Sequence, residues 1–390
     1  MRKDWKIKSL VELEEEGIIL LGRGMVINKK DLAKTPGDYP VYSSAQLDDG
    51  VFGRYGKYMF DEELITWSVD GGGTLFYRTK HKFSITNVGG FCRILRPDLI
   101  SYKYLYFILS YLHSTIKFDW VKKAHPSTLR KEYKTIPLPT LEEQHRFVSA
   151  VDKSFASINI AKVNTEKILK NTKELFESFL FSIFENKSGG WEEKTLKEVS
   201  QDFGRGKSKH RPRGDKSLLG GKYPLIQTGE ISNADHWIDN YTQTYNEKGL
   251  AQSKLWPKGT ICIAIVGANV AETAILNFDA CFPDSVIGII VDSKKANAEY
   301  VDYLLQTFKT ILKEKGKGTA RDNINLGTFE NQKFPFPSVS AQKIIVQKLD
   351  ALSAETKKLE AIYQQKLNDL EELKKSVLQK AFSGELINNN

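Results

Sequence analysis

The sequence feature that most constrains the fold is a segment that occurs twice. The first copy opens with IPLPTLEEQ at Ile136–Gln144, and the second opens with FPFPSVSAQ at Phe334–Gln342, 198 residues further along. Each opening leads into apolar residues at steps of three and four, a pattern that predicts a long amphipathic helix ending near Phe184 or near Phe382. Because two prolines keep the backbone before them extended, each helix is expected to begin only after the second proline.

Each predicted helix has a suitable start directly after that proline. Thr140 and Ser338 each place a hydroxyl where an N-cap residue accepts a hydrogen bond from the first helical turn. Glu142 and Glu143 add negative charge to the first turn of the first copy, where the helix dipole favours it.

The apolar spacing in both copies is that of a coiled-coil seam with a few polar members, such as Lys162 and Lys366. A helix of about 45 residues is roughly 65–70 Å long at 1.5 Å per residue. A globular domain offers no apolar surface of that length, so pairing of the two helices is favoured over two separate helices, each packed on its own domain. The seam residues with the clearest spacing are Phe155, Ile158, Leu169, Phe176, Leu352, Leu359, Leu370 and Leu373.

The duplication extends beyond the helices. The segment that opens with Trp5 at the N-terminus is repeated in outline from Trp191. The repeating unit is therefore an entry strand, a globular domain, a P-x-P hinge and a long helix. This gives four predicted parts, namely globular domains at 1–138 and 187–336 and helical segments at 139–186 and 337–390.

Both globular parts have the pattern of small α/β domains. Short strand-like runs separated by glycine-rich turns are followed by one helix, expected at about 102–118 in the first part and about 298–314 in the second. Val88 and Phe91 of the first part match Val286 and Ile289 of the second at the same offset. We therefore predict that the two globular parts are variants of one scaffold that differ in their loops.

The surplus positive charge lies in the globular parts. Residues 1–140 hold 22 Lys and Arg against 16 Asp and Glu, residues 187–338 hold 21 against 18, and the helical segments are neutral. A charge that served only solubility would have no reason to divide in this way, so it indicates a polyanion bound by the two domains.

Composition also points to a reducing compartment. The sequence has no run of 18 or more apolar residues, and its first ten residues lack the apolar core of a signal peptide. Cys92, Cys262 and Cys281 lie in apolar, strand-like contexts without a CxxC spacing. We interpret them as buried thiols of a cytoplasmic protein.

Motifs for catalysis are missing from the sequence. There is no N-P-P-Y or D-P-P-Y run and no phosphate-binding P-loop, and the histidines have no metal-ligand spacing. The carboxylates at Asp61–Glu63 are better explained as a solvated turn than as an acid–base pair. A methyltransferase or nuclease acting alone is therefore disfavoured, while the charge distribution disfavours a purely structural coiled-coil protein.

Loops that combine cations with small polar residues are the candidate contacts for this polyanion. Residues 204–216 are rich in Lys, Arg and Gly, and cationic loops at 122–128 and 315–323 precede the two P-x-P segments. Hydroxyl and amide side chains follow the two Tyr-Pro strands, where they suit the reading of base edges. The alternatives are a solvated loop for 204–216 and ordinary turn chemistry for the polar residues. The candidates are Ser43, Ser44, Gln46, Lys122, Lys123, His125, Ser127, Thr128, Arg130, Arg205, Lys207, Lys209, Arg211, Arg213, Gln227, Thr228, Lys315, Lys317, Thr319, Arg321 and Asn323.

Together these features resemble the DNA-specificity subunit of type I restriction-modification enzymes over the whole chain. The paired openings at Ile136–Gln144 and Phe334–Gln342 carry the resemblance, and the ending SVLQKAFSGEL at Ser376–Leu386 adds to it. The resemblance implies two α/β (α+β) target-recognition domains joined by a long antiparallel two-helix coiled coil, an internal duplication with pseudo-two-fold symmetry. Each domain would read one half of a bipartite asymmetric DNA site, and helix length would set the spacer, so that an insertion just after Phe184 lengthens it.

The same resemblance implies partners and the absence of catalysis in this chain. Double-stranded DNA would bind the two domains, and two methyltransferase subunits would dock on the helices and carry the restriction and translocase subunits. No cofactor is expected in this chain, since S-adenosylmethionine, ATP and Mg would belong to the partner subunits. The alternatives are a stand-alone DNA methyltransferase or nuclease, or the specificity module of a related fused restriction system.

Overall fold

The chain forms two compact units, Met1–Glu166 with Gln365–Asn390 and Lys167–Gln364, and passes between them twice. None of the helices in the described part of the chain has the length and apolar content that a bilayer crossing requires. The computed structural model describes residues 5–44, 48–70, 72–116, 123–185, 190–210, 214–316, 326–330 and 332–385.

Each P-x-P segment is a β-strand paired with the entry strand of its own unit. In the first unit β8 (Ile136–Leu138) pairs antiparallel with β1 (Lys6–Lys8). In the second, β19 (Lys333–Phe336) pairs antiparallel with β9 (Glu192–Thr195). The predicted hinge is thus wrong, because the extended backbone that proline imposes is used for strand pairing.

The first unit is built on a six-stranded sheet of order β2-β7-β5-β6-β3-β4. Neighbouring strands are antiparallel except β3 and β6, which run parallel. A register shift between Glu62 and Leu64 interrupts the pairing of β5 with β6. The strands are β2 (Ile19–Arg23), β3 (Tyr39–Tyr42), β4 (Val51–Tyr55), β5 (Phe60–Ser68), β6 (Leu75–Ile85) and β7 (Gly89–Ile94).

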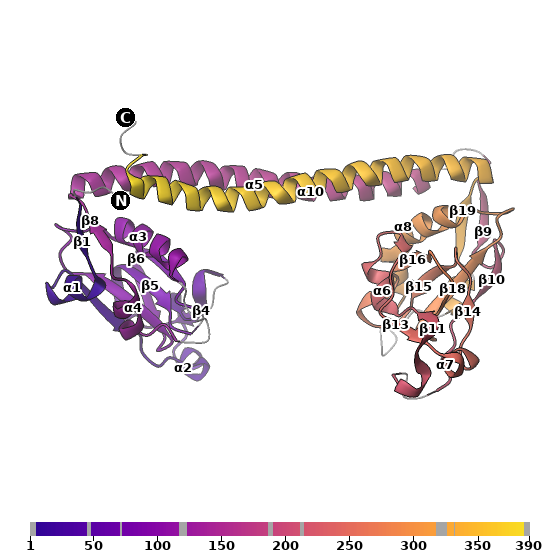
Figure 1. Ribbon diagram of the computed structural model, residues 1–390, viewed down its shortest axis with the longest axis horizontal. Helices are drawn as coiled ribbons and strands as arrows, with labels where there is room; N and C mark the ends of the chain where they lie inside the picture. The colour runs from indigo at the N-terminus through magenta and orange to yellow at the C-terminus, as the bar shows by residue number, and fades with distance from the viewer. Residues whose placement is uncertain are drawn as a thin grey trace. The chain divides into compact units, whose positions relative to one another are not determined.

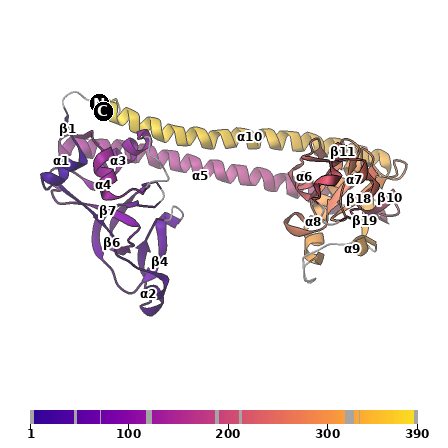
Figure 2. The same ribbon diagram turned by 60° about the horizontal axis from the view of Figure 1, so that its bottom comes forward.

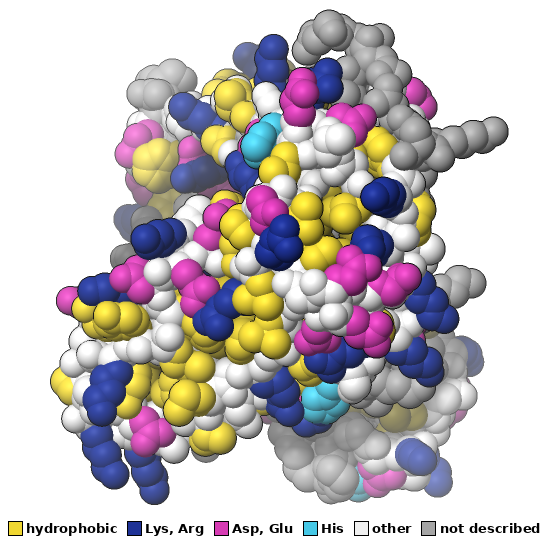
Figure 3. All heavy atoms as spheres, turned by 90° about the vertical axis from the view of Figure 1, so that its left-hand side faces the viewer, with side chains coloured by type: hydrophobic (Ala, Val, Ile, Leu, Met, Phe, Trp, Pro, Cys, Tyr) yellow, Lys and Arg dark blue, Asp and Glu magenta, His cyan; other side chains and the backbone are white. Residues whose placement is uncertain are grey.

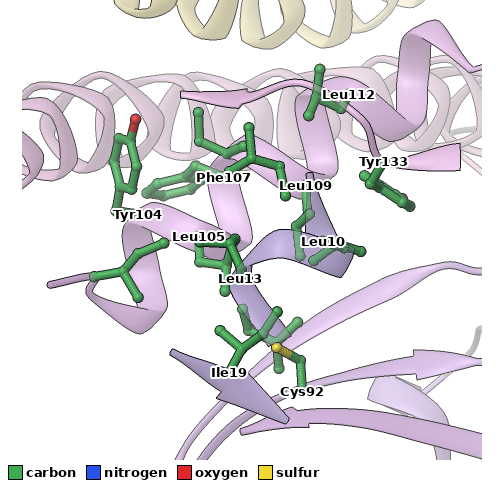
Figure 4. Close-up of a cluster of buried hydrophobic side chains, with 14 of the residues drawn as sticks. Leu10, Leu13, Ile19, Cys92, Tyr104, Leu105, Phe107, Leu109, Leu112 and Tyr133 are labelled. Carbon is green, nitrogen blue, oxygen red and sulfur yellow. The ribbon is translucent and has the colours of Figure 1, made fainter. Parts of the chain in front are cut away.

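Helix α3 (Tyr102–Thr115) organises the first core, lying between the sheet and the start of helix α5 (Figures 1 and 2). Figure 4 shows its apolar side chains meeting those of α1 (Leu10–Glu15), β2 and β7. Among them is the thiol of Cys92, which is buried and free as predicted. Two more short helices, α2 (Lys29–Lys34) and α4 (Pro126–Glu132), complete the unit.

The second unit repeats part of this plan with a different outer part. A five-stranded sheet has the order β10-β18-β15-β16-β12, and a four-stranded sheet has the order β13-β11-β17-β14. The strands are β10 (Ser200–Arg205), β11 (Leu219–Leu225), β12 (Trp237–Ile238), β13 (Gln243–Tyr245), β14 (Leu255–Trp256), β15 (Ile261–Ala264), β16 (Thr273–Leu276), β17 (Ala280–Cys281) and β18 (Val286–Val291). The helices are α6 (Thr228–Asn233), α7 (Glu247–Ala251), α8 (Ala298–Gly316) and α9 (Leu326–Glu330).

The prediction of one scaffold used twice is confirmed in the inner strands. The order β2-β7-β5-β6 of the first unit corresponds to β10-β18-β15-β16 of the second, with antiparallel neighbours throughout. Phe91 in β7 and Ile289 in β18 occupy the matching central strands, as their shared offset indicated. A parallel strand follows in each unit, β3 beside β6 and β12 beside β16, and the strands beyond it differ, so the two domains present different loops.

The duplicated segments form helices of 45 residues each, α5 (Leu141–Glu185) and α10 (Val339–Ser383). In the first unit the ring of Phe382, near the end of α10, lies 4.7 Å from that of Phe147, near the start of α5. In the second unit Phe184, near the end of α5, shares a core with Leu349, near the start of α10. The helices are therefore antiparallel within each unit.

Both predicted N-caps are confirmed. Thr140 Oγ1 accepts a hydrogen bond from the Glu143 backbone N at 3.4 Å, and the Glu143 carboxylate accepts one from the Thr140 backbone N at 3.1 Å. In the second copy Ser338 Oγ accepts from the Ala341 backbone N at 3.3 Å. The reciprocal pair in the first copy is a capping box, which needs the glutamate that only this copy carries.

The α5 seam residues named above are at least half-buried, but Phe179, three residues beyond Phe176 on the same spacing, is 37% exposed, and the seam prediction for α10 is partly wrong. Ile158 is buried, whereas Leu359 and Leu373 are 41% and 45% exposed. The neighbouring Glu360 and Lys374 are half-buried instead, because long charged side chains can lay their aliphatic stems along a helix interface. The other predicted seam residues are half-buried, namely Phe155, Leu169, Phe176, Leu352 and Leu370.

Candidate nucleic-acid interface

The end of strand β5 brings the candidate loops of the first unit together. Ser68 is fully buried there, and its Oγ lies 2.6 Å from the carbonyl oxygen of Asp70 and 3.2 Å from that of Ser44. The adjacent Ser43 Oγ accepts a hydrogen bond from Thr86 Oγ1 at 2.9 Å. The loop after β3 and the loop after β5 therefore share one anchor.

The loop before α4 docks on the same place. The indole Nε1 of Trp67 donates to the carbonyl oxygen of Ala124 at 2.8 Å, and the Ala124 backbone N donates to Val69 O at 2.8 Å. Lys123 Nζ lies 3.3 Å from Asp70 Oδ1, which joins the predicted cation to the loop after β5. Trp67 is thus a core residue whose indole N–H also anchors this loop.

Polar side chains of the loop before α4 are partly accessible. His125 occupies the N-cap position of α4 without a side-chain capping hydrogen bond, and Ser127 is exposed. Thr128 Oγ1 donates to the carbonyl oxygen of Lys123 at 3.3 Å, which closes the loop on itself. This arrangement presents a cation, an imidazole and hydroxyls from one preformed loop.

Arg78 supports this region and was missed from the sequence. Its guanidinium lies 3.6 Å from the ring centroid of Tyr42, and it donates to Thr66 Oγ1 at 3.1 Å and to the carbonyl oxygen of Asp49 at 2.6 Å. Burial lowers the pKa of Arg78 from its ordinary high value. An arginine inside an alternating strand was the available signal, and the hydrogen bond to the Asp49 carbonyl ties β6 to the residues just before β4.

Arg130 is placed differently from its prediction. Its Nε and Nη2 donate to the two carboxylate oxygens of Glu14 at 2.6 and 2.9 Å, which ties α4 to α1. The Arg130 guanidinium also holds the pKa of the Glu14 carboxyl below its usual range. A bidentate pair of this kind satisfies the guanidinium fork, so Arg130 stabilises the domain and is not a good candidate for a phosphate contact.

The basic loop of the second unit starts from a tightly held glycine. The Gly206 backbone N donates to Val286 O at 2.9 Å, and a Cβ on this residue would lie 2.3 Å from the carbonyl oxygen of Phe282. Arg205, at the end of β10, directs its guanidinium to the carbonyl oxygen of Asp284. Lys207 is exposed, and its carbonyl accepts from Ser253 Oγ at 2.9 Å.

Beyond that point the loop turns back on itself. Lys209 is exposed, and the His210 backbone N donates to Gln252 Oε1 at 3.0 Å. His210 Nε2 lies 2.7 Å from Asp215 Oδ2. The described part of this segment is therefore an anchored loop with outward lysines, which fits a phosphate-contacting loop better than a freely solvated one.

Amide side chains gather at the end of β11. Gln227 Nε2 donates to Gln243 Oε1 at 3.0 Å, and the Thr228 carbonyl oxygen accepts from Asn269 Nδ2 at 3.1 Å. Asn269 lies in the loop between β15 and β16, close to Ala271, whose φ of 65° is in the left-handed region. Asn269 is not among the candidate residues predicted from the sequence.

Several predicted residues lie outside the described residues or have side chains that are not described. The side chain of Lys315 is not described, although its backbone lies within helix α8. The predicted residues outside the described ranges are Gln46, Lys122, Arg211, Arg213, Lys317, Thr319, Arg321 and Asn323.

On the face shown in Figure 3, Lys and Arg side chains are interspersed with Asp and Glu and do not form one basic field. The candidate interface is defined instead by its anchored loops at strand ends, which place cations beside hydroxyl and amide groups.

The fold and these loops define a class of protein that presents two loop-bearing α/β domains on paired long helices. Residues 2–171 and 188–372 each match the type I restriction modification DNA specificity domain. The chain belongs to this family and carries its domain twice.

Individual relatives agree with this membership. A Mycoplasma pneumoniae protein named as a type I specificity subunit is 33% identical over 43% of this chain, but that alignment spans only 56% of the relative's own length. A second protein of that organism with the same description is 25% identical over 90% of this chain and 89% of the relative. A chain from a structural study of assembly in a type I R-M system has 18% identity, a TM-score of 0.75 and 99% coverage of both chains, which supports the fold.

Proposed function

We propose that the chain is the DNA-specificity subunit of a type I restriction-modification system, with each domain reading one half of a bipartite, asymmetric site. The observation that carries the proposal is the doubled family domain, each copy followed by its own long helix. One chain thereby presents two separate sets of loops. The first set offers hydroxyls and an imidazole and the second offers amides, so the two half-sites should differ in sequence.

The long helices are proposed to set the spacer and to dock two methyltransferase subunits, which carry the restriction and translocase subunits. Support comes from exposed apolar side chains on the two helices. Ile168, Leu175 and Phe179 of α5 are 39%, 65% and 37% exposed and are spaced seven and four residues apart, which places them on one face. Leu359 and Leu373 of α10 are exposed as well. Apolar rows of this kind are expected to be covered by a partner.

The chain is proposed to be non-catalytic and to bind no cofactor of its own. S-adenosylmethionine, ATP and Mg would act in the partner subunits, and the assembly would work in the cytoplasm of a prokaryotic cell. Isothermal titration of the purified chain with S-adenosylmethionine should give no saturable heat. One binding site per chain would contradict the proposal.

The decisive experiment reconstitutes the chain with methyltransferase subunits and maps modified adenines on a genomic DNA library. The parent chain should yield one bipartite motif with a fixed spacer. Replacing His125, Ser127 and Thr128 together by alanine should alter base tolerance in one half of the motif and leave the other half unchanged. A change in both halves, or a continuous motif, would contradict the division of the site between two domains.

A further inference from the structure

Each long helix begins with a glutamine that is fully buried. Gln144 lies in the first turn of α5 and Gln342 in the first turn of α10, and both side chains are 0% exposed. A primary amide is costly to bury unless its donors and acceptor are satisfied. The hydrogen-bond partners of these two amides therefore indicate why glutamine, and not an apolar residue, occupies this buried position at the start of each helix.

In the first unit, Gln144 connects the helix start to the segment before α3. Its Oε1 accepts from the backbone N of Ser101 at 2.9 Å. Its Nε2 donates to the carbonyl oxygen of Leu99 at 2.9 Å and to that of Pro139 at 3.0 Å. One side chain thus joins the P-x-P strand, the long helix and the domain.

In the second unit, Gln342 makes the corresponding contacts. Its Oε1 accepts from the backbone N of Asn297 at 2.8 Å, and its Nε2 donates to Pro337 O at 2.8 Å and lies 3.5 Å from Lys295 O. Ser101 and Asn297 correspond because each caps the domain helix that follows, α3 or α8.

A tyrosine repeats in the same way beside each glutamine. Tyr104 donates its hydroxyl to the carbonyl oxygen of Pro137 at 3.0 Å, and Tyr300 donates to that of Pro335 at 2.7 Å. Both rings are fully buried. Each P-x-P strand is therefore fixed by strand pairing, by a phenol and by an amide.

The repetition of these contacts is informative because the surrounding domains differ. Beyond the five strands that correspond, the first unit adds β4 to the same sheet and the second unit adds a separate four-stranded sheet, yet the junction between domain and helix has the same polar partners. Buried hydrogen bonds have directional geometry, so they select one orientation, whereas apolar packing tolerates several.

We propose that Gln144 and Gln342 are positioning residues that hold each recognition domain in one orientation on its helix and thereby restrict the spacer to a single length. This inference rests on the proposed function. Replacing Gln144 by alanine leaves the Ser101 N–H and the Leu99 and Pro139 carbonyls without these partners, so the first domain gains freedom at its junction. The loops that contact bases stay intact, so half-site sequences are unaffected.

The test uses the reconstituted complex and DNA substrates with the parent half-sites and a series of spacer lengths. For Gln144→Ala and for Gln342→Ala, the preference for the best spacer over its neighbours should fall by about tenfold, the order of effect of losing buried hydrogen bonds. Both half-site sequences should remain those of the parent. Gln347→Ala is the matched control, because this exposed glutamine lies on α10 close to Gln342.

A folded Gln144→Ala variant with the parent's spacer preference would overturn the proposal. If this variant does not assemble, Tyr104→Phe decides, since it removes only the hydroxyl bonded to Pro137. That variant should broaden the spacer preference by a smaller factor, and an unchanged preference would again overturn the proposal.

Hydrogen exchange of the isolated chain gives a second readout that needs no DNA. The amide of Ser101 should exchange faster in Gln144→Ala than in the parent, while amides in the interior of α3 keep the parent's rates. Parent-like exchange at Ser101 would overturn the proposed junction. A parent complex that fails to methylate at a bipartite site would count against the proposed function, and the exchange experiment would still decide the inference.

Discussion

At the residue scale, Lys207 and Lys209 are exposed lysines that we propose as phosphate contacts. They are exposed on a loop that is anchored at Gly206 and at His210. The double variant Lys207→Ala/Lys209→Ala should reduce the slope of log affinity against log salt by about 2, because each phosphate contact releases roughly one counterion. Filter binding or anisotropy over a salt series measures this slope.

The control for that experiment is Lys153→Ala/Lys167→Ala, which removes two exposed lysines from α5. It carries the same charge change but should leave the slope near the parent's. Equal slopes for the parent and for Lys207→Ala/Lys209→Ala would show that this loop does not contact phosphates.

Arg130 and Glu14 provide a prediction about stability and pH. Arg130→Ala should lower the free energy of unfolding by about 1 kcal/mol at neutral pH, the upper range for pairs that are partly exposed. The pKa of Glu14 is lowered in the folded chain, mainly by its hydrogen bonds to Arg130. Its carboxylate therefore stabilises the fold above its unfolded pKa of about 4.5, and this contribution disappears as the pH falls through the folded pKa.

The difference between the parent and Arg130→Ala should accordingly shrink when urea unfolding is repeated below about pH 4. DNA affinity at neutral pH should change little, because the guanidinium is committed to Glu14. A loss of DNA affinity comparable with that of Lys207→Ala/Lys209→Ala would show that Arg130 contacts DNA after all.

At the scale of elements, the two rows of apolar residues on α10 should respond differently to charge. Leu370→Asp places a carboxylate in the half-buried seam and should destabilise the chain by several kcal/mol, as expected for an unpaired charge at an apolar interface. Leu359→Asp falls on an exposed position and should leave the melting temperature within a few degrees of the parent's. Differential scanning calorimetry compares the two.

The same pair of variants separates folding from assembly. Leu359→Asp should weaken binding of methyltransferase subunits in size-exclusion chromatography even though the chain remains folded. Normal assembly by this variant would show that the outward row near Leu359 is not a docking surface.

Long periodic elements were predictable from the sequence, and several shorter ones were not. Both 45-residue helices and their caps follow from proline, hydroxyl and apolar spacing. The α10 seam was misplaced at Leu359 and Leu373. Their neighbours Glu360 and Lys374 fit the same spacing, and spacing alone cannot tell which of two adjacent rows faces the partner helix. Most partners of Gln144, Arg78 and Arg130 were not predictable because they come from segments far apart in sequence.

At the scale of the whole molecule, the proposal that helix length sets the spacer needs a different test from an insertion just after Phe184. Leu180 and Phe184 already pack in the core of the second unit, so residues added beyond them should leave the spacer unchanged. The sequence alone had suggested a longer spacer for that insertion, because it did not reveal that the end of α5 docks there.

A heptad inserted into both helices should lengthen the spacer. The insertions belong between Glu166 and Lys167 in α5 and between Gln364 and Gln365 in α10, where the chain passes between units. Seven residues add about 10.5 Å, which corresponds to roughly three base pairs, and keep the seam in register. Methylation mapping should show the longer spacer with unchanged half-sites. An unchanged spacer in an active complex would refute the proposal that helix length sets the spacer.

The repeated junctions at Gln144 and Gln342 also bear on how such a chain can evolve. Each junction uses the same amide and phenol contacts, while the domain it holds is free to differ. A genetic crossover within one of the repeated openings would therefore transfer an entire domain and rebuild its attachment from residues already present at the new location. New pairs of domains can arise by recombination in one step, without compensating substitutions in either helix.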